Sequence, residues 1–213
     1  MLTEVQLGSI HSRDRDVNEY IKKLKESTSN FTVIDIGASA NSWCEHVTAA
    51  IDIVDLSKGN IPCFTGNINL FEVWSAVIDY VNTHGKFDFS ICSHTLEDIS
   101  NPPLVAQMLP KIAKRGFISM PSKYIECKRV GAMTGCRGWL HHRWIYNYEE
   151  GKVVGYPKLP FTEYLESLDK VATQGSSEEL SFYWEDICDI EIVNNDYFPS
   201  EIAAIEMYSR LVD

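Results

Sequence analysis

The sequence lacks several features that would place it in a specialised class of proteins. No hydrophobic run approaches the roughly 18 residues that a membrane-spanning helix requires. The N-terminal residues 1–6 contain no basic segment followed by an apolar core, so we expect no signal peptide and a cytoplasmic protein. The six cysteines form no Cys-x-x-Cys pair and are expected to be reduced thiols. We also find no internal repeat and no low-complexity tract.

Positive charge is scarce as well. The 19 Lys and Arg residues face 30 Asp and Glu residues, which gives a net charge of −11. A phosphate backbone is bound by clustered Lys and Arg, so we do not expect a nucleic-acid partner. The composition, 45% hydrophobic and 23% charged, is that of a globular protein, and 213 residues predict a single domain over 1–213.

A metal site is not indicated by the spacing of the cysteines and histidines. Cys127 and Cys136 precede His141 and His142, which gives a loose resemblance to a zinc-binding set. The spacing fits no structural-zinc pattern. We therefore expect no bound metal.

Apolar segments of strand type alternate with amphipathic segments of helical period. This predicts strands at 31–36, 49–54, 87–92 and 116–120, and helices at 13–28, 70–84 and 103–113. Residues 39–48 are a loop or a short helix. Two final strands are expected at 183–193 and 202–211, although the second segment fits a helix equally well.

The alternation of strands and helices predicts an α/β protein. We expect a Rossmann-like three-layer sandwich with a mainly parallel sheet and an insertion after the fifth strand, at about 123–160. In such sheets a ligand lies at the carboxyl ends of the strands, near the point where the strand order reverses. The residues of interest are therefore 37–41, 52–55, 93–97 and 121–123.

The first of these turns follows the strand that ends in Asp35-Ile-Gly, and it continues with Ala38 and Ser39. Gly37 and the small residues after it would let a ligand lie against the backbone. The alternative is an ordinary turn from a strand to a helix. Asp52 ends the second apolar strand, where a carboxylate can accept hydrogen bonds from both hydroxyls of a ribose. Asp55 is the competing candidate, and either acid could instead be solvated.

Asn67 and Ile68 follow an irregular stretch that contains Gly59 and Pro62. A side-chain amide at this position can accept from an adenine amino group and donate to a ring nitrogen. Taken alone, Asn67 is more simply a turn residue.

The order of these motifs resembles that of class I S-adenosylmethionine-dependent methyltransferases over about residues 30–122. Val-Ile-Asp-Ile-Gly is followed by Ile-Asp-Ile, Gly-Asn-Ile and Phe-Asp-Phe-Ser-Ile-Cys-Ser-His-Thr-Leu-Glu-Asp-Ile. Ser-His-Thr-Leu-Glu before Asn-Pro is similar to the small-molecule branch, and His-His-Arg-Trp to an uncharacterised subgroup. The sequence departs from the family where Ser39 and Asn41 replace glycines and where Asn67 replaces an aspartate.

The resemblance implies S-adenosyl-L-methionine as the cofactor and a role for each matching residue. Gly37, Ala38 and Ser39 would pass under its methionine part, with Asp35 near the amino group. Asp52 would hold the ribose, Asn67 and Ile68 would flank the adenine, and Ser93 and His94 would face the sulfonium and the acceptor. His94 either transfers a proton or only shapes the site, and Glu97 either acts with it or caps a turn.

The acceptor is expected to meet the segment from Lys123 to Tyr146, which concentrates arginine and aromatic residues. Arginine suits carboxylate or phosphate groups. Lys123, His142 and Arg143 are the candidate substrate-binding residues, and His141 is a second candidate base beside His94. The alternative is a surface hairpin whose aromatic residues pack on the sheet.

Methyl transfer to a small molecule or a sugar-type acceptor is therefore the function that the sequence favours. A non-catalytic Rossmann-like protein that binds S-adenosylmethionine or acts as a scaffold is the alternative. A nicotinamide-dependent oxidoreductase is disfavoured, because the dinucleotide fingerprint needs three glycines and this turn has one.

Overall fold

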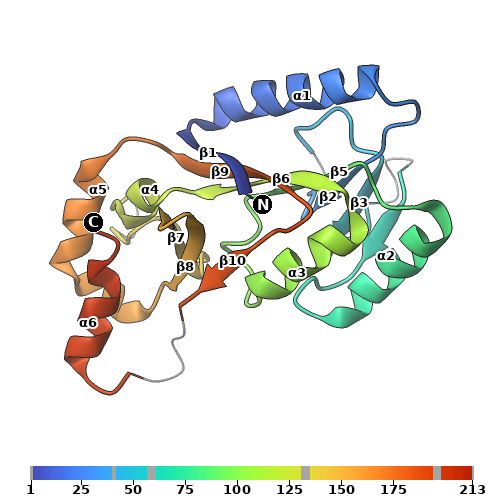
Figure 1. Ribbon diagram of the computed structural model, residues 1–213. Coiled ribbons are helices and arrows are strands. Elements are labelled where there is room, and N and C mark those ends of the chain that lie inside the picture. Colours follow the sequence, from blue (N-terminus) through green and yellow to red (C-terminus); the bar gives the residue numbers. More distant parts are fainter. Residues whose placement is uncertain (1, 40–41, 57–60, 131–134, 194–197, 213) are drawn as a thin grey trace.

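A seven-stranded sheet with the order β1-β9-β6-β5-β2-β3-β4 runs through the centre of the protein. The computed structural model describes residues 2–39, 42–56, 61–130, 135–193 and 198–212 (Figure 1). The parallel strands are β2 (Val33–Ile36), β3 (Ala49–Asp52), β4 (Cys63–Thr65), β5 (Phe89–Ser93) and β6 (Arg115–Pro121). β9 (Glu179–Glu185) lies antiparallel to both β6 and β1 (Leu2–Gly8). The mainly parallel α/β sheet is thus confirmed.

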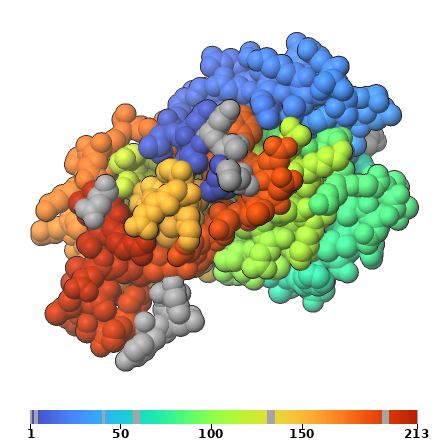
Figure 2. All heavy atoms as spheres, viewed as in Figure 1, coloured from blue at the N-terminus to red at the C-terminus, as the bar shows by residue number. Residues whose placement is uncertain are grey.

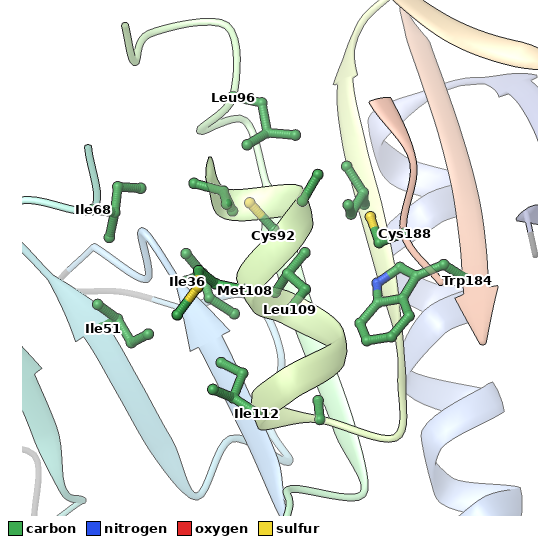
Figure 3. Close-up of a cluster of buried hydrophobic side chains, with 14 of the residues drawn as sticks. Ile36, Ile51, Ile68, Cys92, Leu96, Met108, Leu109, Ile112, Trp184 and Cys188 are labelled. Atoms are coloured by element: carbon green, nitrogen blue, oxygen red, sulfur yellow. The ribbon is translucent and has the colours of Figure 1, made fainter. Parts of the chain in front are cut away.

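Helices cover both faces of this sheet and make three layers. α1 (Ile10–Glu26) covers one face, and α2 (Phe71–His84) and α3 (Pro102–Ile112) cover the other (Figure 1). Val17 and Ile21 of α1 pack in one apolar cluster with residues of β2, β5 and β6. The opposite cluster holds Trp74 of α2 and Leu109 of α3 against Ile36 and other strand residues, with α3 drawn across it in Figure 3.

The ends of these helices follow local chemistry. Ser9 caps α1, since its side chain accepts from the backbone N–H of Ser12 at 3.5 Å. Asn101 caps α3, and Pro102 begins the helix at a position that needs no backbone donor. α2 ends at Gly85, whose φ of +86° is the kind that glycine adopts most readily. The helical period in the sequence located all three helices to within a few residues.

A second, three-stranded sheet with the order β10-β8-β7 lies beyond β6. Its strands are β7 (Trp144–Glu149), β8 (Lys152–Pro157) and β10 (Ile190–Ile192). α4 (Lys123–Cys127), η2 (Pro160–Tyr164), α5 (Glu166–Gln174) and α6 (Glu201–Ser209) accompany it. Tyr156, Leu168 and Tyr208 belong to a separate apolar cluster under these elements. The predicted insertion at about 123–160 therefore supplies β7 and β8 of this sheet, while β10, α5 and α6 come from beyond it.

Some elements of the structure differ from those that the sequence predicts. A single strand at 183–193 was expected, but β9 ends at Glu185, and Asp186 has a φ of +63° that turns the chain toward the other sheet. The segment 202–211 is the helix α6, which the sequence left as the alternative to a strand. β1 and β4 were not predicted. The described part of 39–48 is a loop, and Asn41 lies outside the described residues.

The surface view in Figure 2 places α1 and α2 on opposite sides of the molecule, with the C-terminal elements at one end. In the part of the chain that the structure describes, no helix combines the length and the apolar composition needed to cross a membrane.

Candidate functional site

The strand order reverses between β2 and β5, which lie side by side in the middle of the large sheet. Gly37 follows β2 with a φ of +73°, and Thr95 lies two residues beyond β5. A Cβ atom added to Gly37 would lie 2.4 Å from the Thr95 hydroxyl oxygen, so the two turns touch and only glycine fits between them. Open α/β sheets bind ligands at this kind of switch point.

Asp52 connects the end of β3 to the first turn. One oxygen of its carboxylate accepts from the backbone N–H of Ser39 at 3.2 Å, and the other accepts from that of Val54 at 2.8 Å. Its competitor Asp55 lies on an exposed segment beyond the strand. Of the two acids, Asp52 is therefore the one that lies beside Gly37 and Ser39.

Asp35 lies just before this turn and is buried, with 4% of its surface exposed. Burial raises the pKa of its carboxyl to about 6, although the Ser42 hydroxyl, which donates to it at 2.6 Å, opposes the shift. The negative charge of Asp52 raises the pKa further. A cation placed between these two acids would lower it again.

Asn67 follows β4 and lines a hollow of about 300 Å³ together with Phe64 and Gly66. Ile68 does not line this hollow and is buried in the apolar cluster that α2 and α3 cover. The Asn67 side-chain oxygen already accepts from the backbone and the side-chain amide of Asn69, at 3.0 and 2.9 Å. The Ile68 carbonyl accepts from Trp74. An adenine in this hollow would therefore compete with Asn69 for the oxygen of Asn67.

A network of charges lies beyond the ends of β5 and β6. The Arg13 guanidinium donates to a Glu179 carboxylate oxygen at 2.6 Å and to the Ser93 hydroxyl at 3.0 Å. His94, with a φ of +49°, contacts the same Glu179 oxygen through Nε2. Its Nδ1 lies 3.2 Å from a carboxylate oxygen of Glu97. Three of these side chains are almost fully buried, while that of His94 is 32% exposed.

The two carboxylates decide the charge of His94. Burial lowers the pKa of its imidazole, but the hydrogen bonds and charges of Glu179 and Glu97 outweigh burial and raise the pKa to about 9. His94 is therefore an imidazolium at neutral pH, with both ring nitrogens facing carboxylates. Of the two roles that the sequence left open, this geometry favours shaping the site over accepting a proton.

The segment after Leu140 lies on the turn that follows β5. The backbone N–H of Arg143 donates to the Glu97 carbonyl at 2.6 Å, and its Nε donates to the Asp98 carbonyl at 3.0 Å. The Trp144 indole donates to the Ile99 carbonyl at 2.8 Å. Arg143 therefore helps to hold this turn, and His141 and His142 are brought next to Asp98.

Lys123, the third predicted substrate-binding residue, is not brought together with His142 and Arg143. Its ammonium group donates to the Leu211 carbonyl at 2.8 Å, and it lines a separate hollow of about 600 Å³ with Glu149 and other residues. Cys127, one of the four residues that loosely resemble a zinc-binding set, is fully buried in the apolar cluster of the second sheet.

Arg13 and Glu179 are the site residues that sequence reasoning missed. They are 166 residues apart, and no motif surrounds either of them. Glu126, which contacts His142 at 2.8 Å, was missed too. Its position between Ile125 and Cys127 was the one sign that this acid is buried.

The fold and the site define a Rossmann-like α/β protein with polar side chains gathered at the switch point of its sheet. Solved structures that match it include a S-adenosylmethionine-dependent methyltransferase from Clostridium acetobutylicum, with a TM-score of 0.46, 10% identity, and coverage of 81% of this chain and 91% of that one. The methyltransferase domain of bacterial CtHen1 matches with a TM-score of 0.43 and 9% identity, over 81% of this chain and 98% of that one. The N-terminal domain of EvdMO1 with SAH bound matches with a TM-score of 0.41 and 9% identity, over 79% and 80%. No protein-family model matches the chain, and neither does any curated protein.

Proposed function

We propose that this protein is an S-adenosylmethionine-dependent methyltransferase that acts on a small molecule or a sugar-type acceptor. The observation that carries the proposal is the convergence of Gly37, Asp52 and Ser93-His94 at the carboxyl ends of three adjacent parallel strands. The same residues stand in the order of the methyltransferase motifs in the sequence.

The residues at these strand ends fit the parts of the cofactor. Asp52 has a half-exposed carboxylate beside the first turn, where it can accept from both ribose hydroxyls. Asp35 would attract the positively charged amino group of the cofactor, because a nearby ammonium stabilises the ionised form of the Asp35 carboxyl. Asn67 lines the hollow that we assign to the adenine, and Ile68 follows it in the chain. Gly37 and Ala38 would leave the backbone accessible to the methionine part.

The bound cofactor supplies a methyl group on a positively charged sulfur. The contribution of the chain is then to align an acceptor atom with that methyl group and to exclude water. His94 cannot accept a proton while it carries one between Glu179 and Glu97. A carboxylate acceptor needs no base. A hydroxyl acceptor would rely on His141, whose exposed side chain lies beside Asp98.

Calorimetry with S-adenosylmethionine and its demethylated product tests the proposal. The wild-type protein should bind both, and Asp52→Asn should bind roughly 10- to 100-fold more weakly, since hydrogen bonds to a charged acceptor are lost. Asp55→Asn is the matched control and should bind like the wild type. If the wild-type protein binds neither S-adenosylmethionine nor its demethylated product, the proposal is wrong. If Asp52→Asn binds them as tightly as Asp55→Asn does, the assignment of Asp52 to the ribose is wrong.

A non-catalytic binding protein is the second candidate, and one observation favours it. Two carboxylates hold His94 as an imidazolium. His94, which is expected to face the methyl group, therefore offers no base. Transfer of labelled methyl from S-adenosylmethionine to a panel of sugars, sugar nucleotides and carboxylic acids separates the candidates. Binding without transfer to any compound would favour the second.

A further inference from the structure

We infer that Asp98, His141 and His142 form a binding site for one divalent transition-metal ion. The Nε2 atoms of both histidines lie 3.8 Å from the same Asp98 carboxylate oxygen. The ligand atoms of the three residues lie within 4.8 Å of one another. At 3.8 Å neither histidine makes a direct hydrogen bond to Asp98, so the three side chains surround a common point without closing on it.

The spacing is close to that of a coordination sphere. Nitrogen and oxygen ligands lie about 2.1 Å from Zn²⁺, which places tetrahedral neighbours about 3.4 Å apart. The two histidine–Asp98 distances of 3.8 Å exceed this by a few tenths of an ångström, and the two histidine nitrogens lie within 4.8 Å of each other. His141 and Asp98 have side chains that are 66% and 42% exposed, so small rotations of both can close the difference.

His142 has the support that metal-binding histidines usually have. Its Nδ1 contacts a carboxylate oxygen of Glu126 at 2.8 Å, and both residues are buried. A carboxylate at Nδ1 fixes the proton there and leaves the lone pair on Nε2, the atom that faces Asp98. The orientation of His142 is therefore set from behind, as it is in carboxylate–histidine–metal arrangements.

Glu126 is itself held in place. The Lys158 ammonium lies 2.5 Å from its other oxygen and also donates to the carbonyls of Arg137 and Trp139, at 2.7 Å each. Gly138, with a φ of +50°, leaves space for the Glu126 carboxylate, because a Cβ at this position would lie 2.3 Å from it. The buried carboxylate of Glu126 and the buried ammonium of Lys158 thus together hold the side chain of His142 in place. Packing alone does not explain this arrangement of charges.

The site is open on one side. Three protein ligands leave coordination positions free, which is typical of catalytic metal sites and differs from closed structural sites. A hollow of about 670 Å³ adjoins the two histidines, because His141, His142 and Arg143 line it. An oxygen donor such as a carboxylate or a hydroxyl pair of a ligand could complete the coordination there.

The donor set narrows the choice of metal. Imidazole nitrogens suit Zn²⁺, Cu²⁺, Fe²⁺ or Ni²⁺, whereas Mg²⁺, Ca²⁺ and Mn²⁺ prefer oxygen ligands. Metal binding does not depend on the proposed methyl transfer. If both hold, the ion would lie on the acceptor side and polarise an acceptor hydroxyl, which replaces the base role of His141.

The test is a metal titration of the chelator-treated protein. Equilibrium dialysis against Zn²⁺ should give one ion per chain for the wild type. Asp98→Asn and His141→Ala, both at exposed positions, should bind at least about 10-fold more weakly, as expected for a lost ligand. His11→Ala and Asp55→Asn are the matched controls and should retain wild-type binding. Co²⁺ should give a visible spectrum without a thiolate charge-transfer band.

Three results would overturn the inference: no stoichiometric Zn²⁺ binding, wild-type affinity in both ligand variants, or a thiolate band that places the ion on cysteines. Calorimetry with the demethylated cofactor on the same samples keeps this test separate from that of the proposed function. Asp98→Asn should bind that cofactor like the wild type. Zinc binding without cofactor binding would leave the metal site standing and remove the methyltransferase proposal.

Discussion

Replacing His94 by glutamine should remove a part of the protein's stability that depends on pH. The pKa of His94 is raised from its ordinary value of 6.5 to about 9 in the folded chain. A group with a raised pKa stabilises the fold fully below pH 6.5, where both states are protonated. Between pH 6.5 and 9 the folded protein holds one proton more than the unfolded chain, so the free energy of unfolding falls as pH rises.

The magnitude follows from the two pKa values. Their difference corresponds to roughly 3 kcal/mol at 1.36 kcal/mol per pH unit. The value is an upper limit, because the His94 side chain is 32% exposed and solvent screens part of the interaction. The stability gap between the wild type and His94→Gln should therefore shrink by about 1–3 kcal/mol from about pH 6 to above pH 9.

Urea denaturation of both proteins across this range measures the gap, and His11→Gln, an exposed helix residue, is the control. Subtracting the His94→Gln curve cancels other groups that titrate near pH 9. NMR titration of the His94 ring gives the pKa directly. A ring that titrates near 6.5 would contradict the raised pKa and restore His94 as a candidate base.

Three further predictions follow from the turns and the buried acid. Asp35→Asn should raise the free energy of unfolding at neutral pH by up to about 3 kcal/mol, because burial raises the pKa of Asp35 from 3.8 to about 6 and the ionised carboxylate then destabilises the fold. Urea denaturation at about pH 4, where the buried carboxyl is protonated, should show little gain. A gain that did not depend on pH would contradict this cause. Gly37→Ala should cost more stability than Gly85→Ala, since both have positive φ but only Gly37 lacks room for a Cβ; equal losses on denaturation would mean that the turns do not touch. Gly138→Ala should likewise cost more than Gly151→Ala, which has open space, and should weaken zinc binding while Gly151→Ala does not.

The central sheet and its helices could be predicted because their signals are local. The apolar runs that end at Ile36 and Asp52 are buried strands, and the helical period gave α2 almost to the residue. β1 and β4 were missed for a physical reason. β4 has three residues, and β1 forms the edge of the sheet, so neither carries a long buried pattern.

The gathering of Gly37 and Asp52 at the strand ends was likewise predictable, whereas the charged network beside them was not. Gly37 and Asp52 each end a strand, and parallel strands bring such residues to one edge. Arg13 comes from α1 and Glu179 from β9, and they meet because both elements approach the ends of β5 and β6. That approach depends on the order of strands in the sheet, which the sequence pattern did not specify.

The contrast between two histidines shows how partners, rather than residue type, decide the chemistry of this site. His94 faces a carboxylate at each ring nitrogen, so both nitrogens donate and the ring holds its positive charge. His142 faces a buried carboxylate close to only one nitrogen and an exposed, more distant one at the other. Its second nitrogen thus faces the position that we propose for the metal ion. The sequence predicted His94 as a candidate base and His142 as a substrate-binding residue. The geometry instead favours electrostatic shaping of the strand ends for His94, and it suits His142 to the proposed metal site.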